Sequence, residues 1–282
     1  MNTNSNYEWE VLMINDGSED NTFKMIKELS MKDSRIYYIN LSRNFGKENA
    51  LLAGFDYASG DCMVIMDADL QHPSHVIPKM LQKWEEGYDD VYGKRLSRSK
   101  ESWIRKHLSM AFYNLLQKTA RYDILPNVGD FRLLDRKCID ELKKLRESER
   151  YTKGMYAWIG FRKASIDFET QERIAGESSM SYSALIKLAI NGITSFTVAP
   201  LKWVTYIGIL VSIGAFAFMC YILFCTLVWG NPVAGYPTMM AVILFIGGVQ
   251  MLSLGIIGEY LAKIFKESKR RPIYVIQEKN VE

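Results

Sequence analysis

Short apolar runs alternate with amphipathic segments along the N-terminal part of the chain. The apolar runs occupy residues 10–14, 35–41 and 62–66, and helical patterns follow them at residues 20–31, 46–58 and 74–86. This strand–helix alternation predicts an α/β domain with a mostly parallel sheet and helices on both faces. Ligands of such sheets bind beyond the carboxyl ends of the strands, so the residues that follow each strand are the candidates for a site.

Two long apolar stretches near the C-terminus, residues 203–228 and 231–258, contain no Asp, Glu, Lys or Arg. Each is longer than the roughly 20 residues with which a helix crosses a bilayer, so we expect two transmembrane helices. A buried core hairpin is the alternative, which the length and all-round apolar character of both stretches disfavour. The connector is uncharged, whereas the segment after the second stretch contains Lys263, Lys266, Lys269, Arg270 and Arg271.

This charge asymmetry predicts the topology. By the positive-inside bias, a basic tail at residues 263–282 lies in the cytoplasm. Two crossings return the chain to its starting side, so the N-terminal domain is expected there too. The predicted organisation is a cytoplasmic domain at residues 1–180, a juxtamembrane amphipathic helix at 181–202, a transmembrane hairpin at 203–262 and the tail.

The composition excludes some classes of function. A net charge of +3 on 282 residues gives no strong basic excess of the kind that indicates nucleic-acid binding. The four cysteines lack the paired spacing of a zinc site, so we expect reduced thiols and no structural disulfide. Residues 1–10 are polar, so no signal peptide is expected, and membrane insertion depends on the C-terminal stretches.

Asp16 follows the first predicted strand, within the segment Asn15-Asp16-Gly17-Ser18. One interpretation is a turn with a helix cap, in which Ser18 or Asp20 accepts the first helical amides. The other is that Asp16 binds the ring N–H of a nucleotide base. The local sequence leaves both open.

Asp67 and Asp69 follow the third predicted strand, in the segment Asp67-Ala68-Asp69-Leu70-Gln71. Carboxylates spaced by two can converge on a divalent ion and a diphosphate, and their hard oxygens suit Mg²⁺ or Mn²⁺. The alternative is a solvated strand-to-helix turn. Farther along, the polar segment Gly129-Asp130-Phe131-Arg132 is either a salt-bridged turn or an active-site loop.

Taken together, these segments resemble those of polyisoprenyl-phosphate glycosyltransferases of the GT-A, family 2 type, which are related to dolichol-phosphate mannose synthases and bactoprenol glucosyltransferases. The resemblance covers nearly the whole chain and implies a GT-A, Rossmann-like fold with interface helices. The matching segments are Asn15–Ser18, Asn44–Lys47, Ala58–Asp61, Asp67–Gln71, Gly129–Arg136, Gly176–Ser178 and Gly255–Leu261.

The resemblance implies a metal-dependent, inverting transfer of a sugar from a nucleotide sugar to a membrane polyprenyl phosphate. It places Asp16 at the base, Asp67 beside the nucleotide, and Asp69 and Gln71 on a Mn²⁺ or Mg²⁺ ion. Asp130 matches the catalytic base. A prenyl phosphate is already mostly dianionic at neutral pH, so a positioning role for this residue is equally open.

The resemblance also implies a set of donor or acceptor phosphate contacts, namely Arg95, Arg105, Ser109, Arg132 and Arg173. An interaction of such basic residues with anionic lipid is the alternative for any one of them. Residues 102–121 combine apolar and basic side chains and are expected to lie in the membrane interface. For residues 182–196, interface binding and packing on the sheet are both open.

One departure from the family is large. Family members normally have a further strand and helix before the segment that matches Asn15–Ser18, and we expect about that much to be lacking in this sequence. The competing hypothesis is therefore a catalytically impaired, membrane-anchored nucleotide-sugar binding or scaffold protein. By resemblance we expect UDP-glucose as donor, undecaprenyl phosphate as acceptor, a bacterial inner-membrane location, a tetramer-like homo-oligomer and a separate flippase. No nucleic-acid partner is expected.

Overall fold

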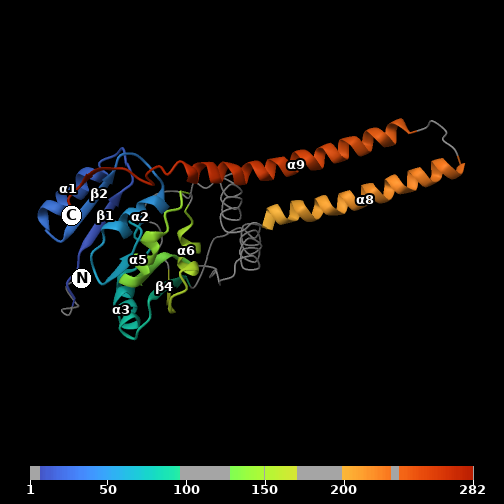
Figure 1. The fold of residues 1–282 in the computed structure, drawn as a ribbon. Coiled ribbons are helices and arrows are strands. Elements are labelled where there is room, and N and C mark those ends of the chain that lie inside the picture. The colour runs from blue at the N-terminus through green and yellow to red at the C-terminus, as the bar shows by residue number, and fades with distance from the viewer. Residues whose placement is uncertain (1–6, 96–127, 149, 170–198, 230–234, 282) are drawn as a thin grey trace. The chain divides into compact units, whose positions relative to one another are not determined.

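The computed structural model describes residues 7–95, 128–148, 150–169, 199–229 and 235–281 (Figure 1). The chain divides into two units, one formed by Met1–Ala189 with Arg271–Glu282 and the other by Ile190–Arg270. Each unit is described by itself below.

The first unit alternates strands with helices, as the hydrophobic pattern predicts. Its elements are β1 (Val11–Asn15), α1 (Thr22–Lys32), β2 (Ile36–Leu41), α2 (Lys47–Tyr57), β3 (Cys62–Ile65), a 3₁₀ turn (Ser74–Val76), α3 (Ile77–Glu85), β4 (Asp90–Arg95), β5 (Val128–Asp135), α5 (Arg136–Lys144), α6 (Thr152–Trp158), β6 (Lys163–Phe168) and β7 (Ile276–Lys279). The mixed α/β class is confirmed.

Among the described residues the strands form two sheets, and their pairing is not mostly parallel as predicted. One sheet has the order β1-β2-β7 and the other β3-β5-β4-β6. β1 and β2 are parallel, as are β4 and β6, but the remaining three of the five pairings are antiparallel. The reason is β5, which is buried along most of its length and lies between β3 and β4, antiparallel to both.

α2 joins the two sheets. On one side Ala53 packs in a cluster with Ile39 and Leu41 of β2. On the other side Leu52 and Phe55 pack with residues of β3, β5, α5 and α6. Both side chains are fully buried, and each such burial stabilises the fold by roughly 1.5–3 kcal/mol. The start of α2 is therefore held at a defined place beside the strand ends.

The chain after the second long helix returns to the first unit. β7 pairs antiparallel with β2, Tyr38 Oη donates to Glu278 at 2.8 Å, and Tyr274 Oη donates to Asp56 of α2 at 2.6 Å. The basic tail predicted at residues 263–282 thus contains two ordered parts. Its beginning continues a helix, and its last part is an edge strand, because apolar Ile273, Tyr274 and Ile276 pack against the core.

The second unit contains the two predicted long helices, α8 (Ala199–Trp229) and α9 (Tyr236–Ser268), which contact each other (Figure 1). Within the described residues, one segment, Phe245–Ser268, is long and apolar enough to cross a membrane. Trp203–Phe218 of α8 is apolar but shorter. Two membrane crossings accordingly remain a prediction.

Candidate active site

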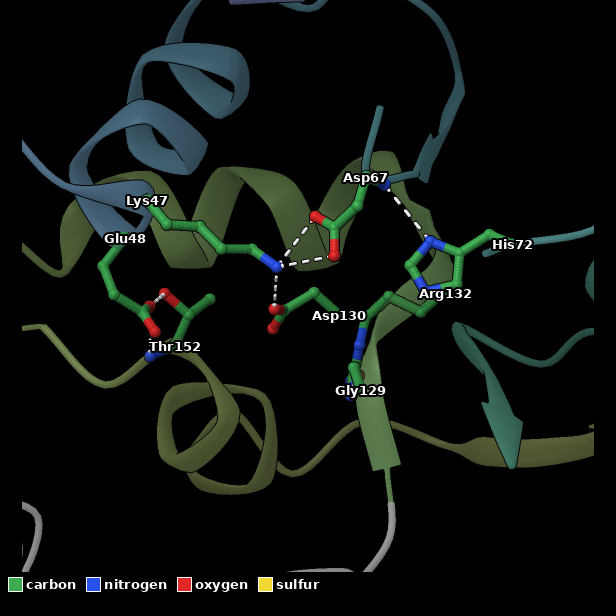
Figure 2. Close-up of polar contacts among 8 residues, drawn as sticks. All are labelled: Lys47, Glu48, Asp67, His72, Gly129, Asp130, Arg132 and Thr152. Carbon is green, nitrogen blue, oxygen red and sulfur yellow. Dashed lines mark hydrogen bonds and ion pairs between the residues drawn. The ribbon is translucent and has the colours of Figure 1, made fainter. Parts of the chain in front are cut away.

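Three charged side chains from different parts of the first unit meet at the strand ends (Figure 2). Lys47 begins α2, Asp67 follows β3, and Asp130 lies on β5. The Lys47 Nζ lies 2.7 Å from Asp67 Oδ1, 2.8 Å from Asp67 Oδ2 and 2.8 Å from Asp130 Oδ2. The structure brings Asp67 and Asp130, two of the predicted site residues, to one ammonium group, while their roles stay predictions. In the sequence, Lys47 belongs only to a matching segment.

Asp130 is the most buried member of this group, with a side chain that is 8% exposed. Burial by itself raises the pKa of Asp130, but the Lys47 ammonium opposes it and holds the pKa below its usual value. The carboxylate is therefore ionised at neutral pH. Its Oδ2 accepts from Lys47, while the buried Oδ1 has no hydrogen-bond partner among the described residues. Oδ1 is thus a shielded acceptor without a partner from the described residues.

The segment from Asp67 to His72 is a tight turn. Asp69 Oδ1 accepts from the Gln71 amide at 3.1 Å, and Leu70 takes the left-handed conformation with φ of 60°. The Asp67 amide donates to His72 Nδ1 at 3.2 Å, and the His72 ring stacks on Phe131 at 4.7 Å. Burial lowers the pKa of His72, so the imidazole is neutral and Nδ1 is an acceptor.

The oxygens of Asp69 and Gln71 fit a hard divalent ion chemically. Among the described residues, no group of three or more His, Cys, Asp or Glu side chains could hold a metal by itself. An ion at this turn would therefore take its remaining ligands from water and from a bound diphosphate, as Mg²⁺ commonly does in phosphate sites.

Asp16 caps the loop before α2. Its two carboxylate oxygens accept from the amides of Phe45 at 2.7 Å and Gly46 at 2.9 Å. Gly17, with φ of +66°, packs directly against the backbone of Arg43 and Asn44. The structure thus gives the Asp16 carboxylate contacts within the protein, and the predicted contact with a base stays a prediction.

Of the two residues predicted to accept the first helical amides after β1, Asp20 does so. Its Oδ1 accepts from the Thr22 amide at 2.9 Å at the start of α1.

A separate contact links α2 with α6. Glu48 of α2 accepts from the amide of Thr152 at 2.9 Å and from its hydroxyl. This contact ties the first turn of α2 to the first turn of α6 (Figure 2).

Arg132 of β5 is buried and paired with a carboxylate. Its guanidinium is 4% exposed and donates to Asp90 Oδ2 at 2.9 Å, and its carbon lies 3.6 Å from the Tyr156 ring centroid. Arg132 is thus paired with a buried carboxylate of the neighbouring strand β4, and the predicted phosphate contact stays a prediction.

Of the other residues predicted to contact phosphate, Arg95 lies among the described residues. Arg95 ends β4, and its guanidinium approaches Gly129. Arg105, Ser109 and Arg173 lie outside the described residues, as do the predicted interface helices at residues 102–121 and 182–196. Their roles stay predictions.

Two family profiles match the chain. Residues 2–143 match glycosyl transferase family 2, and residues 199–264 match the GtrB C-terminal hairpin. The two matches correspond to the strand-rich part of the first unit and to the α8–α9 pair.

Curated proteins match over nearly the whole chain. A bactoprenol glucosyl transferase of Shigella phage SfV is 42% identical over 96% of this chain and 88% of its own length. A prophage bactoprenol glucosyl transferase homolog of Escherichia coli is 40% identical over 96% of this chain and 89% of its own length. An uncharacterized glycosyltransferase of Synechocystis is 42% identical over 96% of this chain and 85% of its own length.

Proposed function

The chain belongs to glycosyltransferase family 2, and we propose that it transfers a hexosyl group from a nucleotide sugar, UDP-glucose first among them, to a membrane polyprenyl phosphate such as undecaprenyl phosphate. The observation that carries the proposal is the buried, ionised Asp130, which has an oxygen without a partner among the described residues and shares Lys47 with Asp67. The names of the bactoprenol glucosyl transferase relatives support the acceptor class.

In the proposed reaction a phosphate oxygen of the lipid attacks the anomeric carbon from the face opposite the leaving group. The bond from that carbon to the diphosphate oxygen breaks with inversion, and a nucleoside diphosphate leaves. A phosphate monoester, with a second pKa of about 6, is mostly dianionic at neutral pH and needs little help to lose a proton. Asp130 therefore acts by accepting a hydrogen bond and orienting a substrate hydroxyl.

Two anionic substrates must meet in this site, so offsetting their charge is the main electrostatic task. Asp69 and Gln71 would hold a Mn²⁺ or Mg²⁺ ion, which when bound neutralises charge on the departing diphosphate. Arg95 at the end of β4 supplies a fixed cation nearby, with Arg105, Ser109 and Arg173 proposed for the phosphates as well. Orientation of both substrates supplies much of the rest of the rate.

We place the enzyme at the bacterial inner membrane. α8 and α9 would form a two-span hairpin, which the match to the hairpin profile supports, with the catalytic unit and both termini in the cytoplasm. A homo-oligomer, tetrameric by resemblance, and a separate flippase for the lipid-linked sugar complete the proposal.

Membranes that contain the chain, supplied with Mn²⁺, a short-chain prenyl phosphate and a panel of labelled nucleotide sugars, test the proposal. We expect label from one preferred donor to enter the organic phase. Asp69→Ala should abolish the metal-stimulated transfer, whereas Asp140→Ala, at an exposed acid on α5, should leave it unchanged. Binding of a nucleotide sugar with no transfer from any donor would instead support the scaffold hypothesis.

A further inference from the structure

We propose that Lys47 is a positioning residue of the transfer reaction, which fixes Asp67 and Asp130 at one point of the site. The inference rests on the proposed function. Its starting point is that carboxylates from two distant segments, the turn after β3 and strand β5, both contact one ammonium group. Without the cation between them, the two anions would repel each other in a site that is partly shielded from water.

The contacts of the ammonium group argue for positioning rather than for substrate binding. A lysine ammonium has three hydrogen-bond donors. Three carboxylate oxygens lie 2.7–2.8 Å from Nζ, two of Asp67 and one of Asp130. All three donors are thus used within the protein, which leaves none for a phosphate. Among the described residues Asp130 Oδ1 has no hydrogen-bond partner, so Lys47 also decides which of the two Asp130 oxygens stays unpaired.

The backbone of Lys47 is fixed from both sides, unlike that of an ordinary surface lysine. The two amides before it, those of Phe45 and Gly46, donate to Asp16. The residue after it, Glu48, accepts two hydrogen bonds from Thr152 at the start of α6. The first turn of α2 is therefore held between the loop after β1 and α6, and the lysine side chain starts from a preorganised position.

The experiment compares K47M, K47R and the exposed control K79Q on α3 with the parent protein in the transfer assay. Loss of charge-assisted hydrogen bonds should lower kcat by about 10- to 100-fold in K47M. The KM for the nucleotide sugar, and the affinity for the nucleoside diphosphate measured without lipid, should change little. K47R keeps the charge and should recover most of the rate, and K79Q should match the parent.

The pH profile supplies a second readout. Asp130 faces the cations Lys47 of α2, Lys153 of α6 and Arg132 of β5. Without the Lys47 charge, burial raises the pKa of Asp130. The pH at which kcat/KM falls in acid should therefore be higher in K47M than in the parent, and K47R should restore the parent value.

The outcomes separate the two proposals. If the parent transfers no sugar, the proposed function fails and the role of Lys47 falls with it. If the parent is active and K47M equals it, the positioning role alone is wrong. A K47M variant with unchanged kcat but a raised KM and weaker nucleotide binding would overturn the inference in favour of direct phosphate contact.

Discussion

Replacement of Gly17 by alanine should destabilise the first unit severely. Gly17 has φ of +66°, and a Cβ built there would lie 2.3 Å from the carbonyl carbon of Arg43 and 2.5 Å from the amide nitrogen of Asn44. Ordinary carbon contacts are about 3.5 Å, so the loop would have to move by about 1 Å. The atoms in the way are backbone atoms, which cannot rotate aside as a side chain would.

The expected loss of stability in G17A has two parts. The left-handed conformation costs a residue with a Cβ roughly 1–2 kcal/mol. Movement of the loop also weakens the hydrogen bonds from Phe45 and Gly46 to Asp16, and hydrogen bonds to charged groups contribute about 1.5–3 kcal/mol. We therefore expect G17A to lose about 3–5 kcal/mol, a large share of the 5–15 kcal/mol that is typical of a folded domain.

Gly160 provides the matched control. It has φ of +71°, and an added Cβ would come no nearer than 3.9 Å to a neighbouring atom. G160A should therefore lose only the conformational part, about 1–2 kcal/mol. Urea unfolding of the detergent-solubilised proteins, followed by near-ultraviolet circular dichroism, measures both variants. If G17A and G160A lost the same free energy of unfolding, the argument that the close contact of residue 17 with the loop before α2 adds to the destabilisation would be refuted.

Other predictions concern buried charge, the C-terminal strand and acid stability. Asp90→Ala should cost about 3–5 kcal/mol because it leaves Arg132 buried and unpaired, and unfolding of the double variant D90L/R132M should recover most of that loss. Tyr274→Phe should lose about 1 kcal/mol with its hydrogen bond to α2, and an unchanged urea midpoint would contradict it. The folded pKa of Asp130 is lowered, so its pairing contributes at neutral pH and is lost as the pH falls through that lowered value. Unfolding midpoints of the parent and K47M should accordingly converge in acid.

The strand–helix alternation could be predicted from the sequence because hydrophobic period is a local property. The pairing of the strands could not. β5 lies antiparallel between β3 and β4, and nothing within its own residues specifies its neighbours. β7 is not evident in the sequence because Ile276–Lys279 has a single apolar residue in a short span and follows a strongly basic segment.

The site was predictable to a similar degree. Two aspartates at a strand end indicate a polar site, and Asp67 does meet Asp130 through a shared partner. The partner, Lys47, was overlooked because a lysine in the first turn of a helix ordinarily extends into solvent. The sequence likewise does not indicate the partner of Arg132, because that carboxylate lies 42 residues away in the chain. Sequence spacing indicated the kind of chemistry at these positions but not the direction in which each side chain points.

The return of the chain to β2 imposes an order on biosynthesis. Tyr38 and Asn280, which hydrogen-bond across the β2–β7 edge, are 242 residues apart, so this edge forms only once Asn280 has left the ribosome. By then both long helices have been made, and closing so distant a contact is slow in comparison with local pairing. Until that moment β2 presents a vacant edge, of the kind on which nascent chains aggregate. A first unit that includes β7 is therefore complete only after α8 and α9 have been synthesised.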